Sequence, residues 1–474
     1  MKILFPRVAV CAAITAAAAM MVAVAATETS PTAPLMVSAA RQKPTDPWLD
    51  YPTRVISSLP GYALHADSER SIYGGIKATP HAATGFFYAK KITSRWWLID
   101  PSGYRFINVG VVDVHIPPGS ATVNRNLREK FGTPARWADA TTDFLRAHGF
   151  NGTGAWSDDA VLRAAKRPVV YTPIWNFMSE YGKHRGGMYQ QSGHMGYPKD
   201  CIFVFDPEFV TFCDEYAKQL AATKDDPWLL GHYSDNELPF YRKALDNFLS
   251  LPAADPGHKA AEEWLAQRRA RHLADETGIT DAMRLDFLGF VADRYLQVTT
   301  AAIRKYDPNH LCLGPRFTGQ ALDARTIFEA AGRYLDVIAV NYYHAWSPAP
   351  ERMRNWGEWS GKPFLVTEWY AKGMDSGYAN TSGAGWVVKT QADRGRFYQN
   401  FTIGLIESGN CVGWHWFKYM DNDPGDQTVD PSNTNSNKGE VNLRFEAYTP
   451  LTEAMTELNG QIYGLAEYFD ARKK

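Results

Sequence analysis

Short apolar runs recur along the chain, and each is followed by a segment in which apolar residues return at helical spacing. Eight runs have the character of strands: residues 106–111, 149–156, 169–175, 228–237, 311–317, 337–343, 364–369 and 411–417. A nearly continuous apolar run predicts a strand that is buried on both faces, as in a parallel sheet. The alternation therefore predicts an α/β fold, and eight strand–helix units predict a (β/α)8 TIM barrel.

Two connections are longer than a minimal barrel requires. Residues 241–300 follow the fourth run and contain a charged helical pattern, which predicts a long helical insertion. Residues 372–394 follow the seventh run and are rich in Gly, Ser and Asn. A loop of that length in a compact domain is usually functional. Ahead of the first run, the Asp-Pro-Ser-Gly turn at residues 100–103 predicts a hairpin.

The first 25 residues have the pattern of an export signal. Lys2 and Arg7 precede an Ala-rich apolar stretch, and Ala23-Val24-Ala25 is a small-x-small cleavage signal. An uncleaved membrane anchor is the alternative. We expect a secreted or periplasmic protein after cleavage near Ala25, with no transmembrane segment in the remainder. Residues 26–50, rich in Thr, Ser, Ala and Pro, are expected to be a flexible leader, and residues 51–474 a single domain.

The amino-acid composition limits the classes of molecule that this protein is expected to bind. The 474 residues include 50 Lys and Arg against 51 Asp and Glu, so no basic surface for nucleic acid or anionic lipid is expected. Phe, Tyr and Trp make up 13 %, which suits a core together with stacking surfaces for sugar rings. The sequence contains no phosphate loop, dinucleotide fingerprint, His-Glu-x-x-His or Gly-x-Ser-x-Gly motif. We therefore expect neither a cofactor nor a metal.

The cysteines and one acidic segment leave alternatives open. Cys201 and Cys213 flank an apolar segment, and in an exported chain they form either a disulfide or two free thiols. Cys312 and Cys411 lie in strand-like runs and are expected to be buried. Residues 421–426 (DNDPGD) look like part of a calcium loop but lack the Glu at the required spacing.

Two glutamates stand at the ends of predicted strands. Glu237 closes the fourth run and Glu368 closes the seventh, both in phase with interior positions of their strands. The carboxyl ends of barrel strands meet at one face, where active sites of this architecture lie. Glycosidic hydrolysis needs such a carboxylate pair, one group as proton donor and the other as nucleophile or base.

Several neighbours of this pair are candidates for supporting roles. Asn236 is placed to bond a sugar hydroxyl. Tyr342 or Tyr343 is expected to donate to Glu368 and keep it ionised, so Glu237 would need the higher pKa. The remaining candidates for substrate binding, all at or just past strand ends, are Asp113, His344, Trp369, His415, Trp416 and Lys418. Trp416 is the expected platform for a sugar ring; the charged residues and histidines are alternatively scaffold residues, as are Arg316 and Asp421.

Both glutamates lie in familiar local sequences. Asp235-Asn236-Glu237-Leu238 and Thr367-Glu368-Trp369-Tyr370 resemble the large clan of retaining (β/α)8-barrel glycosidases with an Asn-Glu acid/base. The segments of residues 372–401, residues 412–417 (VGWHWF) and residues 421–423 (DND) resemble the β-agarases of glycoside hydrolase family 50. The resemblance covers residues 85–460 and is densest between residues 360 and 425.

The resemblance implies a function and roles for the pair. It implies that Glu237 is the general acid/base, that Glu368 is the nucleophile, and that the substrate is a galactan polysaccharide or oligosaccharide cleaved at β-1,4 bonds. Members of the family usually carry a β-rich, carbohydrate-binding-like domain ahead of the barrel, for which little chain is available here. The alternatives are a β-galactosidase or other galactan hydrolase, and a non-catalytic sugar-binding protein on the same barrel.

Overall fold

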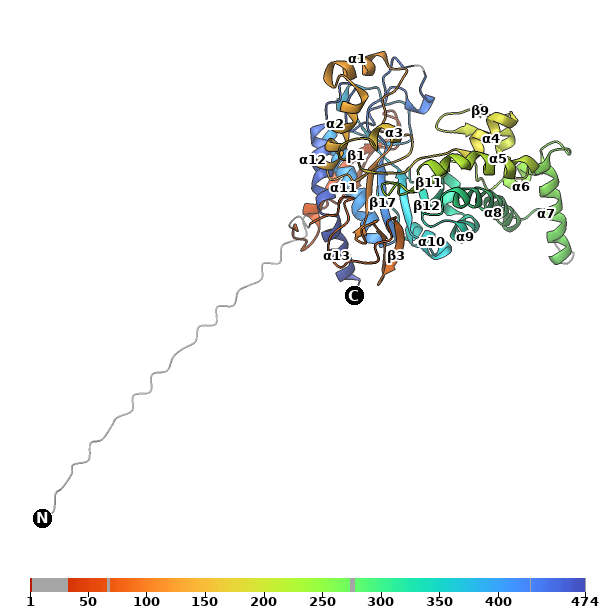
Figure 1. The fold of residues 1–474 in the computed structure, drawn as a ribbon, viewed down its shortest axis with the longest axis horizontal. Helices are drawn as coiled ribbons and strands as arrows, with labels where there is room; N and C mark the ends of the chain where they lie inside the picture. Colours follow the sequence, from red (N-terminus) through yellow and green to blue (C-terminus); the bar gives the residue numbers. More distant parts are fainter. Residues whose placement is uncertain (2–32, 66–68, 273–277, 427, 474) are drawn as a thin grey trace. The chain divides into compact units, whose positions relative to one another are not determined.

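The computed structural model describes residues 1, 33–65, 69–272, 278–426 and 428–473 (Figure 1). The expected export signal therefore lies outside the described residues, Met1 excepted. The chain divides into two units, Met1–Pro34 and Leu35–Lys474, and the second contains every element discussed below. Among the residues described, none of the helices combines the length and the apolar character needed to span a membrane.

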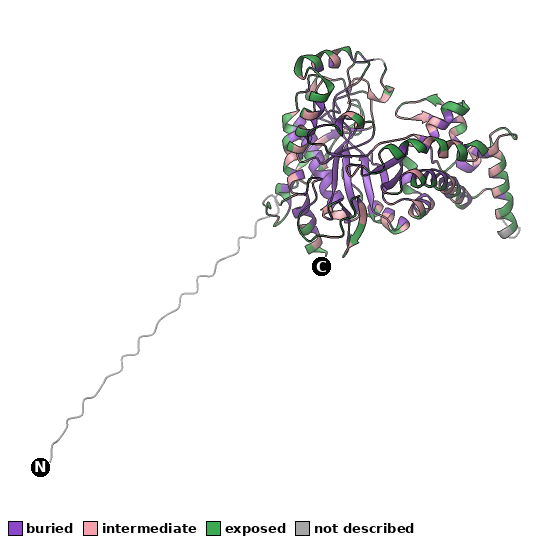
Figure 2. Ribbon diagram, in the orientation of Figure 1, coloured by how far each residue is buried: buried purple, intermediate pink, exposed green. Residues whose placement is uncertain are grey.

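Eight parallel strands run through the centre of this unit. They are β6 (Asn108–Val111), β7 (Gly152–Thr153), β8 (Val170–Tyr171), β11 (Gly231–Asn236), β12 (Leu311–Arg316), β13 (Ile338–Asn341), β14 (Phe364–Glu368) and β17 (Cys411–Trp416). Each strand falls within one of the eight predicted runs, so these strand predictions are confirmed. Almost all of their residues are buried, as expected for strands covered on both faces (Figure 2).

The strands are distributed over separate hydrogen-bonded sheets. One sheet has the order β13-β14-β17-β6-β7-β8, and a second contains β11 and β12. Isolated parallel bridges link neighbouring segments: Tyr171 with Leu229, Ile174 with Tyr233, and Phe317 with Val340. The fold is thus mixed α/β, and the ladders themselves do not form one continuous closed barrel.

Helices follow the strands and place their exposed faces outward (Figure 2). They are α1 (Ala121–Lys130), α2 (Pro134–Ala147), α3 (Asp159–Leu162), α4 (Phe177–Arg185), α5 (Pro207–Ala217), α9 (Arg325–Tyr334), α10 (Pro350–Ser360) and α11 (Gln391–Ser408), then α12 (Thr449–Gly460) and α13 (Ile462–Arg472). Local sequence sets the ends of α11: the Thr390 side chain accepts from Asp393 N, and Gly409 supplies the left-handed residue that ends the helix. Most of α11 is buried because α12 and α13 cover it.

The two long connections have the predicted positions. The insertion consists of α6 (Ala244–Leu249), α7 (Pro256–His272) and α8 (Asp281–Tyr306), which lie together at the right of Figure 1. The connection after β14 contains β15 (Ala371–Gly373) and β16 (Trp386–Val388). The predicted hairpin is formed by β4 (Arg95–Ile99) and β5 (Arg105–Phe106), with β3 (Tyr88–Ile92) on the other side of β4.

The expected flexible leader, residues 26–50, differs from the structure in its second half. Residues Met36–Ala40 form β1 and Trp48–Pro52 form β2, in a sheet of order β15-β16-β1-β2. Val37 and Ala39 are buried there. The segment is ordered because its small apolar residues pair with β16, a partner that composition alone does not reveal. The four described cysteines are buried and free, so Cys201 and Cys213 do not form a disulfide.

Candidate active site

A cavity of about 840 Å³ lies at the carboxyl ends of the strands. Its wall brings together five residues expected from the sequence, listed here in chain order: Asp113, Asn236, Glu237, Tyr343 and Glu368. The hairpin of β9 (Tyr189–Gln190) and β10 (Met195–Gly196) borders the same cavity. Asp430 fixes this hairpin, accepting from Gln190 Nε2 at 2.8 Å and from Gly193 N at 2.9 Å.

Four residues of the cavity wall that follow strands in the sequence have a left-handed backbone conformation. Asp113, Trp156, Asn176 and Glu237 have φ of 60°, 59°, 56° and 49°, and all four line the cavity. A residue other than glycine rarely adopts positive φ, and each instance costs about 1–3 kcal/mol. Such strain persists when surrounding contacts determine the conformation, and it concentrates at functional sites.

Glu237 is held in a largely dry position. Its side chain is 12 % exposed, and Asn341 Nδ2 donates to its Oε1 at 2.8 Å. Thr367 Oγ1 donates to Asn341 Oδ1 at 2.7 Å, which turns the amide so that its NH₂ group faces Glu237. Burial, and after it the charge of Glu368, raise the pKa of Glu237 to about 7. Glu237 can therefore hold a proton near neutral pH and donate it.

Glu368 is buried and accepts a hydrogen bond at each oxygen. Arg316 Nη2 donates to Oε1 at 2.6 Å, and Tyr343 Oη donates to Oε2 at 2.5 Å. The predicted bond from a tyrosine is thus confirmed for Tyr343. Arg316 also donates to Asn236 Oδ1 at 3.2 Å, so it fixes both strand ends. A planar guanidinium matches a carboxylate well and compensates its charge inside the protein.

Asp113 forms part of a charged group beside the pair. Lys418 Nζ donates to Asp113 Oδ2 at 2.5 Å, and His115 Nδ1 lies 2.7 Å from Asp113 Oδ1. Burial alone would raise the pKa of Asp113, but His115 and Lys418 outweigh it and lower that pKa. The charge of Asp113 in turn raises the pKa of His115. Asp113 and His115 line the cavity, whereas Lys418 lies behind Asp113.

Sequence comparison identifies relatives that match most of this chain. No protein-family model matches it. β-Agarase B and β-agarase A of Vibrio sp. (strain JT0107) are each 25 % identical, over 501 and 511 residues, covering 84 % and 85 % of this chain. The matches cover 50 % and 49 % of those proteins, so the chain spans about half the length of the curated relatives it matches.

Structural comparison decides the family. The crystal structure of BpGH50 is 30 % identical, with a TM-score of 0.81, over 92 % of this chain and 96 % of that one. The chain belongs to the GH50 family. PfGH50B and the agarase AgWH50C share the fold at 22 % identity each, with TM-scores of 0.70 and 0.68 over 85 % and 84 % of this chain.

Besides Lys418, four candidates for substrate contact are buried in this GH50 protein and do not line the cavity. Trp416 is 0 % exposed and donates from Nε1 to the Lys438 carbonyl at 3.2 Å, so it is not an open platform. Trp369 stacks on Phe401. The other two are Tyr342, whose Oη accepts from Ala349 N, and His415, which lies 2.6 Å from Asn108 Oδ1. Trp369 and Trp416 both pack against Tyr398 of α11, so they lie on the helix side of their strands and not in the cavity.

The last candidate, His344, is exposed and outside the cavity wall. Its backbone is left-handed, with φ of 63°, at the turn that follows β13. The residue two positions before it, Tyr342, is core, and the neighbouring Tyr343 takes the place beside Glu368. A one-residue difference at a strand end therefore separates a site residue from a surface residue here.

Sequence reasoning missed several residues of the GH50 site. Asn341 was not singled out, although it ends an apolar strand with an amide, and Arg316 was considered only as a scaffold or ligand residue. Both are recognisable as polar residues that close buried strands. Trp156 and His194 also line the cavity, with His194 Nδ1 3.8 Å from Glu237 Oε2. His194 gave no signal in the sequence because the β9–β10 hairpin carries it there.

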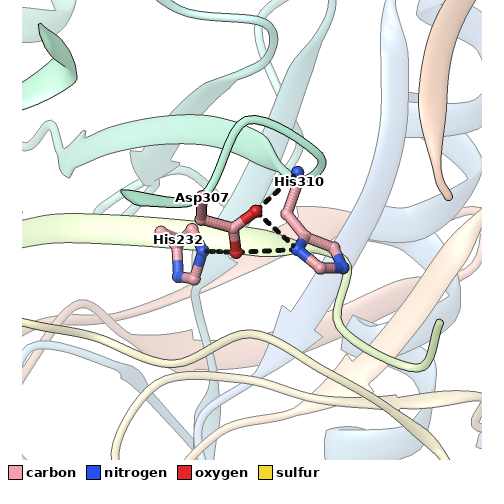
Figure 3. Close-up of side chains that lie close together, drawn as sticks. All are labelled: His232, Asp307 and His310. Atoms are coloured by element: carbon pink, nitrogen blue, oxygen red, sulfur yellow. Dashed lines mark hydrogen bonds and ion pairs between the residues drawn. The ribbon is translucent and has the colours of Figure 1, made fainter. Parts of the chain in front are cut away.

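A second cluster has the composition of a metal site but not its hydrogen-bond pattern. His232, Asp307 and His310 are buried, with Asp307 between the two rings, and their ligand atoms lie within 4.8 Å of one another (Figure 3). His232 Nε2 lies 2.8 Å from Asp307 Oδ2, and Trp175 Nε1 donates to His232 Nδ1 at 2.9 Å. Because Nδ1 accepts, Nε2 must carry the proton and has no lone pair for a metal.

The His310 ring is also fully engaged. Its Nδ1 lies 2.7 Å from Asp307 Oδ2, and its Nε2 lies 2.9 Å from the Asp226 carbonyl, which can only accept. Burial would raise the pKa of Asp307, but His232 and His310 outweigh it and lower that pKa. The cluster lies at the amino-terminal ends of β11 and β12, opposite to Glu237. Its geometry fits a buried hydrogen-bond network that stabilises the fold.

Proposed function

We propose that this protein is a secreted retaining glycoside hydrolase that cleaves β-1,4-galactosidic bonds of agarose or neoagaro-oligosaccharides. The observation that carries the proposal is the unequal pair in one cavity. Glu237 has a pKa raised to about 7, while Glu368 is held by Arg316 and Tyr343. Two neighbouring carboxyl groups in such different environments are suited to different roles, one as the proton donor and the other as the nucleophile.

The two steps follow from these environments. Glu368 attacks the anomeric carbon while Glu237 gives its proton to the departing oxygen, and a covalent glycosyl-enzyme forms. Glu237, now ionised, removes a proton from water, and the water oxygen displaces Glu368 from the anomeric carbon. Asn341 binds Glu237 through its NH₂ group, which favours the ionised form and so assists this second step. Retention requires carboxyl groups about 5 Å apart.

The fold supports the same assignment. We propose that the eight parallel strands make up a (β/α)8 barrel, because the isolated bridges join the two sheets in the order that a barrel requires. The pair then lies at the carboxyl-terminal face, where enzymes of this architecture act. The Lys2–Ala25 pattern supports export by a cleaved signal.

Charge around the cavity supports an uncharged substrate. The lysines and arginine at or behind its described wall are each bound by protein groups: Lys183 by Glu180, Lys418 by Asp113, Arg316 by Glu368, and Lys438 by the Ser432 carbonyl and Asn433 Oδ1. A sulfate or carboxylate on the sugar would find no unpaired cation there. This favours agarose over sulfated galactans.

Product analysis tests the proposal. Purified protein is incubated with agarose, neoagaro-oligosaccharides, porphyran, carrageenan and an aryl β-galactoside, and the first-formed anomer is followed by NMR. We expect β-configured products from the neutral agar substrates, and none from Glu368→Ala. An initially inverted anomer would contradict the retaining mechanism. Hydrolysis of the aryl galactoside alone would favour a β-galactosidase, and binding without any product would indicate a sugar-binding protein.

A further inference from the structure

Trp156 is the aromatic residue of the cavity wall with the largest exposed surface. It is 36 % exposed, whereas Tyr370 and Phe417 in the same wall are 2 % and 6 % exposed. A half-open indole in a polar cavity offers a flat apolar face next to groups that hydrogen-bond. It therefore has the property for which Trp416 was considered, at a different strand end.

Arg316 covers one face of the Trp156 ring. The guanidinium carbon lies 4.5 Å from the ring centroid, and Arg316 is fully buried. The same guanidinium donates to Glu368 Oε1 at 2.6 Å. A single planar group thus contacts the indole and the carboxylate that we assign as nucleophile, and the uncovered part of the ring borders the cavity beside that carboxylate.

The backbone at Trp156 is strained and firmly held. Its φ is 59°, an outlier for a bulky residue. Bonds on both sides fix this turn: Asp113 N donates to the Ala155 carbonyl at 2.9 Å, and Ser157 Oγ donates to the Gly154 carbonyl at 2.8 Å. Glycine would adopt this conformation without cost, so the side chain accounts for the strain. Backbone strain of this kind concentrates at functional sites, which indicates that the Trp156 side chain has a function in the cavity.

We propose that Trp156 is the platform on which a galactose-type ring stacks next to Glu368. This rests on the proposed function, since it names the surface that orients the ring that Glu368 attacks. The C–H face of the sugar packs on the open face of the indole. Arg316 stacks on the other face of the indole and fixes its position relative to Glu368. Trp156 is then a substrate-positioning residue, and its removal lowers affinity for the sugar itself.

The test measures binding without turnover. Neoagaro-oligosaccharide binding is titrated by calorimetry in Glu237→Gln, alone and combined with Trp156→Ala, Trp156→Gly or Trp156→Phe. We expect affinity to fall at least about tenfold with Ala and Gly and less with Phe, which keeps a ring. Phe290→Ala is the matched control and should leave the affinity for neoagaro-oligosaccharides unchanged. Phe290 is an aromatic residue on α8 that is 37 % exposed and lies outside the cavity wall.

Two results would overturn the proposal, and they are distinguishable. If the wild-type protein hydrolyses neoagaro-oligosaccharides but Trp156→Ala and Trp156→Gly bind them as the parent does, Trp156 serves only to hold Arg316. If the wild-type protein neither binds nor hydrolyses any galactan, the proposed function fails and the platform fails with it. Trp156→Gly guards against misfolding, because it relieves the positive φ; its melting temperature should equal or exceed that of Trp156→Ala.

Discussion

Replacing Glu237 with glutamine should stabilise the protein at neutral pH while it abolishes hydrolysis. The folded-state pKa of Glu237 is about 7 against an ordinary value of 4.5, so the folded protein binds this proton more tightly than the unfolded chain does. Stability therefore falls as pH rises from about 4.5 to about 7, and the cost of ionising a buried group is fully present above that range.

The magnitude follows from the two values. At 1.36 kcal/mol per pH unit, a pKa of about 7 against 4.5 corresponds to about 3 kcal/mol. Glutamine keeps an oxygen to accept from Asn341 Nδ2 and carries no charge beside Glu368, so Glu237→Gln removes this cost. Dividing this free energy by an unfolding entropy of about 2.1 cal/mol/K per residue predicts that the melting temperature rises by roughly 3 °C at pH 8.

The assay compares melting temperatures of the wild-type protein and Glu237→Gln between pH 4.5 and pH 8. The difference should be near zero at pH 4.5 and should grow to its full value by pH 8. Glu368→Gln is the control background, because removing the neighbouring charge lowers the pKa of Glu237 and should shrink the gain. A difference that is constant with pH would refute the raised pKa and, with it, the role of Glu237 as proton donor.

Four further outcomes are expected. Wild-type kcat/KM on neoagaro-oligosaccharides should decline tenfold per pH unit above about pH 7, as Glu237 loses its proton; a flat profile to pH 9 would count against this. Tyr343→Phe removes the 2.5 Å bond to Glu368 and should lower kcat by about tenfold to a hundredfold with little change in melting temperature. Asp307→Asn leaves two buried histidines without their carboxylate and should cost about 3–5 kcal/mol in urea unfolding, while added Zn²⁺ or EDTA leaves wild-type stability unchanged. Asp430→Ala frees the β9–β10 hairpin and should raise KM several-fold at unchanged kcat; an unchanged KM would show that the hairpin is placed without it.

The strands and the glutamate pair were predictable because their signals are local. Each buried strand is a nearly continuous apolar run, and Glu237 and Glu368 are in phase with the buried positions of theirs. The ends of such runs therefore indicate both the architecture and the position of the carboxylates.

The errors arose where contacts are long-range. Trp416 is covered by Trp369 and by Tyr398 of α11, which belong to other elements of the fold. The hydrogen bonds from Arg316 to Glu368 and from Asn341 to Glu237 join different strands, so periodicity along one strand does not reveal them. The ordered segment Met36–Ala40 reads as a leader because its partner strand lies far along the chain.

That last pairing has a consequence for biosynthesis. Ala39 pairs with Val388, and Lys372 Nζ donates to the Gln42 carbonyl across a separation of 330 residues. β1 can pair with β2 as soon as both are made, but a chain that emerges from its N-terminus first leaves the other edge of β1 unpaired until β16 has been made. Gln42 lines the cavity, so one edge of the cavity is completed late in synthesis. Until then β1 is an open edge, available to other unfinished chains, and slow synthesis should raise the yield of aggregates.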